Sequence, residues 1–159
     1  MKIKVGFGFD VHQLKKNHPF YIGGVKLEHS LGAFGHSDAD VLVHAICDAL
    51  LGAANLRDIG FHFSNTDDRW KGISSLTLLE KTVALLKDKG WAIGNIDAML
   101  CLEAPKINPY IPKMKANIAK AGGIGEDDIS IKATTNEAMG FVGREEGVVA
   151  YAVCLIEKA

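Results

Sequence analysis

The first segment of this chain alternates apolar and polar residues, which predicts a β-strand with two different faces. Every second position of residues 2–12 is apolar, and a period of two residues is typical of a strand that is buried on one side. The apolar face carries Ile3, Val5, Phe7, Phe9 and Val11, and the opposite face carries Lys4, Gly6, Gly8, Asp10 and His12.

Further strands are predicted along the chain. Residues 20–27 form a predicted hairpin, because Gly23-Gly24 at its centre can adopt the positive φ angles of a tight turn. The polar run 15–18 between the first strand and this hairpin is predicted to be a loop. Three later segments are apolar enough to be strands, at residues 93–103, 129–135 and 148–156.

Three segments carry the apolar stripe of a helix, with a period near 3.6 residues. The first opens at His36-Ser37-Asp38-Ala39-Asp40, with Ser37 as the expected N-cap. The second begins at Ser74 or Ser75 and closes at Gly90. The third follows Asn108-Pro109, with Asn108 as the expected N-cap. Between the first two helices, residues 58–68 are polar and aperiodic, which predicts a long loop.

This order of elements predicts an α+β two-layer sandwich. The expected sheet is mixed and of a four-stranded type, with a small hairpin beside it and the helices on one face. Residues 1–159 are expected to form a single domain, since this is an ordinary domain length. No helix remains to cover the other face of the sheet, so self-association is the expected cover.

Composition excludes several classes of protein. Hydrophobic residues make up 48%, enough for a core, and a net charge of −1 gives no basic surface for nucleic acid. No apolar run reaches the length of a membrane span. The cysteines Cys47, Cys101 and Cys154 lack the spacing of a zinc ribbon or redox pair. We therefore expect a soluble cytoplasmic protein with reduced thiols, or an organellar protein without its transit segment.

The first candidate functional site is a metal site. Asp10 and His12 share one face of the first strand, and His44 on the first helix offers a third ligand. An Asp-His-His set with an open fourth position suits a catalytic zinc ion. Asp40 and Asp48 flank His44 on the same helix face, and either could orient its imidazole. The alternative is two exposed polar residues at a strand end and a surface histidine in an ion pair.

Other residues are suited to binding a phosphate group. His36-Ser37 at a predicted helix N-terminus would face an anion with free backbone N–H groups. Thr134-Thr135-Asn136-Glu137 follows a strand, where its hydroxyls could donate to phosphate oxygens. Glu137 could hold a hard cation such as Mg²⁺ or Mn²⁺. Lys106 could meet another phosphate, although most exposed lysines are only solvated.

Taken together, these motifs closely resemble the 2-C-methyl-D-erythritol 2,4-cyclodiphosphate synthase family of the non-mevalonate isoprenoid pathway. They occur in family order over nearly the whole chain, so the set is specific although no single motif is decisive. The matching stretches are Gly8-Phe9-Asp10-Val11-His12, Ile22-Gly23-Gly24-Val25, His36-Ser37-Asp38-Ala39-Asp40-Val41, Asp48-Ala49-Leu50-Leu51-Gly52-Ala53, Asp58-Ile59-Gly60, Ala104-Pro105-Lys106, Lys132-Ala133-Thr134-Thr135-Asn136-Glu137 and Gly140-Phe141-Val142-Gly143-Arg144-Glu145-Glu146-Gly147.

The resemblance implies a lyase that acts on a cytidine-diphosphate small molecule, 4-diphosphocytidyl-2-C-methyl-D-erythritol 2-phosphate. The 2-phosphate attacks the β-phosphorus, CMP leaves, and 2-C-methyl-D-erythritol 2,4-cyclodiphosphate forms. The resemblance also implies a homotrimer with three active sites between adjacent subunits. No nucleic acid or membrane partner is implied.

Roles for individual residues are also implied by the resemblance. Asp10, His12 and His44 would bind Zn²⁺, and Glu137 would help hold a second divalent ion, Mg²⁺ or Mn²⁺. His36 and Thr135 would stabilise the transition state. Substrate contacts are expected from Asp10, Val11, His12, His36, Ser37, Asp58, Ile59, Gly60, Phe63, Ser64, Asn65, Thr66, Asp67, Leu102, Glu103, Ala104, Pro105, Lys106, Ile107, Asn108, Thr134, Thr135, Asn136, Glu137, Phe141 and Arg144.

The chain departs from the family at Ser64-Asn65, where Pro-Asp is usual. The loop loses a rigid proline and a carboxylate, which leaves the role of Asn65 in substrate binding open. In a trimer, one Arg144 per subunit would form a positive ring over an apolar channel lined in part by Phe141. Such a cavity would suit a prenyl diphosphate; the alternative is that Arg144 pairs with Glu145, Glu146 or another carboxylate.

Two other functions compete with cyclisation. The first is a metal-dependent phosphohydrolase that uses the same Asp-His-His zinc to activate water. The second is a non-enzymatic trimeric binding protein for an isoprenoid diphosphate. The intact set of Asp10, His12, His44 and Glu137 favours an enzyme.

Overall fold

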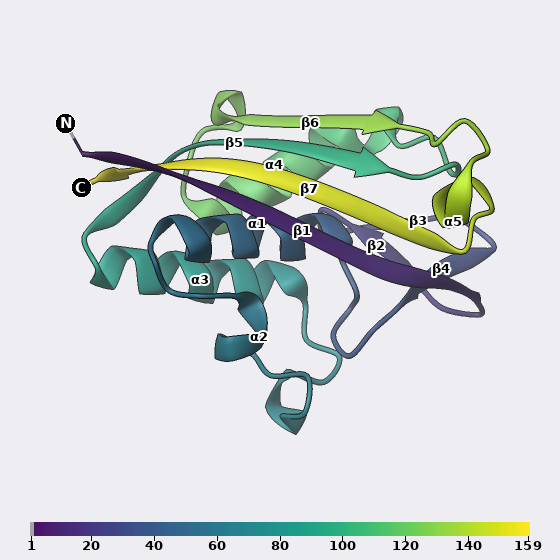
Figure 1. Cartoon of the computed structure of the whole chain (residues 1–159), viewed down its shortest axis with the longest axis horizontal. Coiled ribbons are helices and arrows are strands. Elements are labelled where there is room, and N and C mark those ends of the chain that lie inside the picture. Colours follow the sequence, from purple (N-terminus) through teal and green to yellow (C-terminus); the bar gives the residue numbers. More distant parts are fainter. Residues whose placement is uncertain (1) are drawn as a thin grey trace.

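The computed structural model describes residues 2–159, and its centre is a mixed five-stranded sheet (Figure 1). Across the sheet the strands follow the order β4-β1-β7-β5-β6, and a separate two-stranded sheet pairs β2 with β3. The strands are β1 (Ile3–Lys16), β2 (Phe20–Ile22), β3 (Val25–Leu27), β4 (Leu31–Phe34), β5 (Trp91–Cys101), β6 (Ile129–Thr134) and β7 (Gly147–Lys158).

Helices cover one face of this sheet, as the sequence predicted (Figure 1). The α-helices are α1 (Val41–Ala53), α2 (Ile59–His62), α3 (Ser75–Asp88), α4 (Ile111–Gly122) and α5 (Gly140–Gly143), and the 3₁₀ turns are η1 (Asp68–Trp70), η2 (Asn108–Tyr110) and η3 (Glu126–Asp128). A hydrophobic core lies between the helices and the sheet, centred on the wholly buried Leu42, Ile46, Leu50 and Leu100.

The sheet has one strand more than predicted, and its first strand is longer. Lys15 and Lys16, expected in a loop, pair with Gly32 and Leu31 of β4. The prediction missed β4 because a strand of four residues has almost no periodicity to detect. Only β5 and β6 run parallel, and the other pairs in this sheet are antiparallel.

Two glycines let β1 lie directly on α1. A Cβ atom at Gly6 would overlap the carbonyl oxygen of Ala49, and one at Gly8 would overlap that of Ala45. The next residues on this face of β1 are Asp10 and His12. The close approach therefore carries both candidate ligands to the start of α1, where His44 lies.

The start of α1 differs from the prediction. The N-cap is Asp40, not Ser37, because the Asp40 carboxylate accepts the N–H of Val43. The same buried carboxylate also accepts the N–H groups of Gly23 and Gly24, at 3.0 and 2.7 Å. Asp40 thus joins the β2–β3 turn to α1. The helix begins at Val41, and the Asp40 carboxylate already accepts an N–H group at its N-terminus. His36 and Ser37 therefore do not lie at free N–H groups of a helix N-terminus, as the expected anion site required.

Two loop boundaries also shift. The expected loop at 58–68 contains the short helix α2 and leads into η1. The third long helix begins at Ile111, after the 3₁₀ turn η2, so Asn108 is not its N-cap. The expected stop at Gly90 is confirmed, since Gly90 has φ +71° directly after the C-cap Lys89.

The face of the sheet away from the helices is apolar and exposed. In β1, Val5 and Phe7 are 65% and 64% exposed, and their apolar neighbours on this strand are also exposed. Tyr151 and Val153 of β7 continue the patch, and the rings of Phe7 and Phe9 pack against Tyr151 at a tilt. We call this patch the bare face; its residues are Ile3, Val5, Phe7, Phe9, Val11, Tyr151 and Val153.

The three cysteines are free thiols, as expected. Cys47 and Cys154 are buried, and burial raises the pKa of the Cys47 thiol to about 12. None of the helices formed by residues 2–159 has the length and apolar character that a membrane span needs.

Candidate active site

The structure brings Asp10, His12 and His44 together as the sequence predicted. Oδ2 of Asp10 lies 2.9 Å from Nε2 of His12 and 3.0 Å from Nδ1 of His44, and these two nitrogens are 3.1 Å apart. The two strand residues are separated from His44 by more than 30 positions in the sequence. The packing of β1 on α1 is what unites them.

These three atoms fit a single metal ion. Two ligands bound at about 2.0–2.1 Å in tetrahedral geometry lie roughly 3.3 Å apart, close to the separations found here. One carboxylate oxygen and two imidazole nitrogens form a donor set typical of zinc. Among residues 2–159, this is the one group of three His, Cys, Asp or Glu side chains with ligand atoms close enough to share an ion.

The electrostatics of the group follow from its contacts. Burial alone would raise the pKa of Asp10, but hydrogen bonds and charges from His12 and His44 outweigh burial and lower this pKa to about 2. Burial opposes the charged form of His44, yet the hydrogen bond and charge of Asp10 raise the pKa of His44. The carboxylate is therefore fully ionised at neutral pH and available to a cation.

The partners of His44 differ from those predicted. Asp48 accepts the N–H of Ile59 at 2.7 Å, and Asp40 is used by the hairpin turn, so neither carboxylate bonds to the imidazole. Instead, Nε2 of His44 lies 2.8 Å from Oγ of Ser75 and 3.1 Å from Oγ of Ser37. The prediction considered only residues on the same helix, whereas Ser75 comes from α3.

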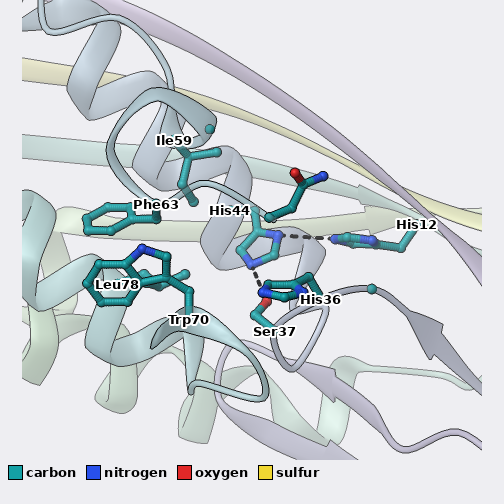
Figure 2. A pocket seen from close by; sticks show the side chains of 11 residues that line it. His12, His36, Ser37, His44, Ile59, Phe63, Trp70 and Leu78 are labelled. Atoms are coloured by element: carbon teal, nitrogen blue, oxygen red, sulfur yellow. Dashed lines mark hydrogen bonds between the residues drawn. The ribbon is translucent and has the colours of Figure 1, made fainter. Parts of the chain in front are cut away.

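A pocket of about 350 Å³ opens beside the metal group. Figure 2 shows His44 between His12 and Ser37, with Phe63 and Trp70 as an aromatic wall on the other side. The lining residues are His12, Gly35, His36, Ser37, His44, Ile59, Gly60, Phe63, Asn65, Trp70 and Leu78. We call this hollow the metal pocket.

Six expected substrate contacts outside the ligand set line the metal pocket. They are His36, Ser37, Ile59, Gly60, Phe63 and Asn65. Other members of the same segment lie nearby without lining it. Ser64 and Thr66 bond to each other through their hydroxyls, and Asp67 forms an ion pair with Arg69. Asp58 immediately precedes α2 and is exposed.

Most of the substrate contacts expected at residues 102–108 and 134–135 line a second pocket of about 270 Å³. It is walled by Leu102, Glu103, Pro105, Lys106, Ile107, Asn108, Ala133, Thr134 and Thr135. Ala104 belongs to the same turn but does not line the hollow. The Glu103 carboxylate accepts the N–H of Asn136 at 2.7 Å and so joins the two loops that form the walls. We call this hollow the loop pocket.

Within one chain, the two pockets are separated by the width of the sheet. Asp10 pairs with Ala150, Ala150 with Leu100, and Leu100 with Ala133. Three strand spacings of about 4.8 Å amount to roughly 14 Å. The strand register therefore keeps the β6 wall of the loop pocket away from the metal group of the same chain.

Three other expected contacts lie elsewhere. Val11 points to the bare face. Phe141 lines a hollow of about 140 Å³ together with Phe9, Cys101 and Tyr151. Arg144 makes two 3.1 Å hydrogen bonds to Glu146, which is the pairing that the sequence left open as an alternative.

Sequence reasoning missed Trp70, Ser75 and Leu78. A tryptophan in an otherwise polar segment was a usable signal for the pocket wall. Ser75 had been considered only as a helix cap, because its contact with His44 depends on how α1 and α3 pack together.

Comparison with known proteins agrees with this site. The model of the YgbB family matches residues 3–157. A Cytophaga hutchinsonii protein named 2-C-methyl-D-erythritol 2,4-cyclodiphosphate synthase is 63% identical over 158 residues, covering 99% of each chain.

Solved structures agree as well. A structure of 2C-methyl-D-erythritol-2,4-cyclodiphosphate synthase superposes with a TM-score of 0.89 at 32% identity, covering 97% of this chain and 100% of that one. A Plasmodium falciparum protein solved as a CDP complex gives 0.86 at 30% identity, covering 98% and 96%. The resemblance found in the sequence is confirmed: the chain belongs to the YgbB family, that of the 2-C-methyl-D-erythritol 2,4-cyclodiphosphate synthases.

Proposed function

We propose that this chain is a CMP-releasing phosphorus–oxygen lyase, which converts 4-diphosphocytidyl-2-C-methyl-D-erythritol 2-phosphate to 2-C-methyl-D-erythritol 2,4-cyclodiphosphate. The observation that carries the proposal is the Asp10-His12-His44 group at the wall of the metal pocket, in a chain of this family. A CDP complex of a Plasmodium falciparum relative supports a cytidine-diphosphate ligand.

The reaction asks the protein to position charge rather than to supply a strong base. The attacking phosphate is already ionised at neutral pH, so the barrier lies in bringing two anions into line. A bound zinc ion would act as Lewis acid and template for a phosphate oxygen. Asp10, His12 and His44 would hold this ion, and His36 in the same pocket would donate to a phosphate oxygen.

The loop pocket would receive the cytidine end of the substrate. Main-chain groups of its walls can read the edge of the base, and the hydroxyl of Thr135, which lines this pocket, would donate to a diphosphate oxygen. Glu137, two residues after Thr135, is exposed. We assign it to a second divalent ion, Mg²⁺ or Mn²⁺, whose other ligands would be diphosphate oxygens and water.

The separation of the two pockets supports a homotrimer with active sites between subunits. A diphosphate cannot contact both pockets of one chain across roughly 14 Å. In a closed ring, the metal pocket of one copy can meet the loop pocket of the next. The bare face offers the apolar surface for such a ring, since large exposed apolar patches mark interaction sites.

A product assay with metal analysis tests this function. Protein loaded with zinc and Mg²⁺ is given the cytidine-diphosphate substrate, and products are followed by ³¹P NMR. Cyclisation yields CMP and the cyclic diphosphate, whereas a phosphohydrolase would yield CMP and open-chain phosphates. His44→Ala is the control, because two remaining ligands should not retain zinc. Open-chain products, or an active zinc-loaded His44→Ala protein, would contradict the proposal.

We also propose that the trimer axis binds a prenyl diphosphate, although Arg144 already has a partner in Glu146. The apolar hollow lined by Phe9, Phe141 and Tyr151 on the bare-face side supports this ligand. Farnesyl diphosphate should raise the melting temperature of wild type, and Arg144→Ala should lose this effect while keeping its metal. An unchanged wild-type melting temperature would leave Arg144 as a partner of Glu146 only.

A further inference from the structure

The first residue of α3 contacts the metal group from behind. Ser75 is completely buried, and its Oγ lies 2.8 Å from Nε2 of His44, the ring nitrogen that faces away from Asp10 and His12. The same hydroxyl bonds to Oδ1 of Asp38, and the backbone N–H of Ser75 donates to Oδ2 of Asp38 at 3.0 Å. One serine thus links a carboxylate to a ligand imidazole.

Donor and acceptor counts fix the direction of this chain of bonds. A serine hydroxyl has a single hydrogen, and a carboxylate can only accept. The hydroxyl hydrogen therefore goes to Asp38, and Oγ of Ser75 is left to accept a hydrogen from Nε2 of His44. With its hydrogen on Nε2, the neutral imidazole keeps the lone pair of Nδ1 for a metal ion. The hydrogen bond between Nδ1 and Oδ2 of Asp10 uses a second proton, on Nδ1, which a bound ion would replace.

Asp38 is itself held in place by the backbone. Its N–H donates to the carbonyl of Ile73, and its Oδ1 accepts the N–H of Asp40 at 3.2 Å. Nearby, the N–H of Gly72 donates to the carbonyl of His36. Three contacts therefore join residues 36–38 to residues 72–75 at the start of α3. They are His36 with Gly72, Asp38 with Ile73, and Asp38 with Ser75.

We propose that Ser75, held by Asp38, is a positioning residue for the metal: it keeps the His44 ring in the orientation and tautomer that present Nδ1 as a ligand. This rests on the metal site of the proposed function. Hydrogen-bonded partners behind a ligand histidine typically change metal affinity by roughly ten- to a hundredfold. Ser37, at 3.1 Å from the same nitrogen, is the weaker of the two hydroxyl contacts.

Zinc affinity, measured against a competing chromophoric chelator, tests the proposal without the reaction. Ser75→Ala should weaken zinc binding roughly ten- to a hundredfold and alter the visible spectrum of the Co²⁺-substituted protein. Ser75→Thr keeps the hydroxyl and should recover both properties. Asp38→Ala, which removes both acceptor oxygens that orient Ser75, should weaken zinc binding in the same direction.

Thr82→Ala is the matched control, because Thr82 is an equally buried hydroxyl on α3, about two turns further along. It should leave zinc affinity and the Co²⁺ spectrum unchanged. Wild-type zinc affinity in both Ser75→Ala and Asp38→Ala, or equal losses in Ser75→Ala and Thr82→Ala, would overturn the proposal. Zinc binding that survives His44→Ala would instead overturn the metal site itself, and the positioning role with it.

Discussion

The metal pocket and the loop pocket are built in different ways. The metal pocket rests on side chains of β1, α1 and α3 that hydrogen-bond to one another, with Asp10, His12 and His44 all partly buried. The loop pocket is formed by two segments that follow β5 and β6, and Thr134 and Thr135 are exposed. The metal pocket is organised by side-chain contacts within the chain, whereas the loop pocket offers main-chain N–H and C=O groups and hydroxyls.

This difference indicates a division of labour in the reaction. A metal site needs ligand atoms fixed to within a fraction of an ångström, which packed elements provide better than loops. A nucleotide site needs backbone donors and acceptors on an accessible edge, which loops supply. Each pocket is only half of the proposed site. Substitutions in the metal pocket, in the loop pocket and in the surface between copies should therefore change different measured properties.

Disrupting the proposed trimer should have the largest effect. Phe7→Glu places a charge on the bare face at a side chain that is 64% exposed, so the single chain should still fold. Burying that charge between copies would cost several kcal/mol, so we expect monomers that bind zinc but have no detectable turnover. Sedimentation and metal analysis check this. Phe61→Glu, at a phenylalanine 57% exposed on α2, is the control and should keep the oligomeric state of the wild type.

Mixing two inactive variants sharpens the comparison. His44→Ala removes the metal half of a site, and a Thr135→Ala, Glu137→Ala double variant removes the loop half; each alone should lose more than about a hundredfold in turnover. Co-refolded at equal amounts, they should recover about a quarter of wild-type activity, since one site in four then pairs two intact halves.

A same-half pair is the control for this mixing experiment. His44→Ala with Asp10→Ala should recover nothing, because every site then lacks an intact metal half. If the different-half pair also recovers nothing, both halves of a site come from one chain, against the separation of roughly 14 Å.

The second ion should respond to Glu137 alone. Glu137→Gln should leave zinc bound and raise the Mg²⁺ concentration needed for half-maximal turnover about tenfold, the loss of about 1.4 kcal/mol of binding. A divalent-ion titration at fixed zinc measures this shift. Glu126→Gln, at an exposed acid in η3, should change nothing. An unchanged titration for Glu137→Gln would remove this residue from the ion site.

The bond between the two walls of the loop pocket should have a moderate effect. Glu103→Ala removes the acceptor of the Asn136 N–H, a loss of about 1 kcal/mol. We expect KM for the cytidine substrate to rise about fivefold with little change in kcat. Glu103→Gln keeps an acceptor oxygen and should stay near wild type. A fall in kcat with KM unchanged would argue that the loops are positioned for chemistry instead.

The smallest effect is expected at Asn65. This side chain lines the metal pocket, where the family usually has a carboxylate. If Asn65 only hydrogen-bonds a substrate hydroxyl, Asn65→Asp should change kcat/KM by less than about tenfold, or 1.4 kcal/mol. A larger gain would show that the charge missing at this position matters for the transition state.

Much of the site could be predicted from the sequence because its residues obey local rules. The two-residue period of β1 put Asp10 and His12 on one face, and the order of the motifs identified the family. The same rules failed at β4, whose four residues are too few for a period, and at the start of α1. There, Ser37 was a reasonable cap locally, but Asp40 takes that place while also binding Gly23 and Gly24.

The sequence by itself determined the longer strands and helices, since their periods depend on neighbours along the chain, and the order of its motifs determined the family and the three candidate metal ligands. Only the tertiary structure decided which partner holds His44, because Ser75 reaches it through the packing of α3 beside α1. Tertiary structure also decided that Ala133, in the wall of the loop pocket, lies three strands away from Asp10. Strand order sets that separation, and strand order depends on long-range pairing that no local pattern encodes.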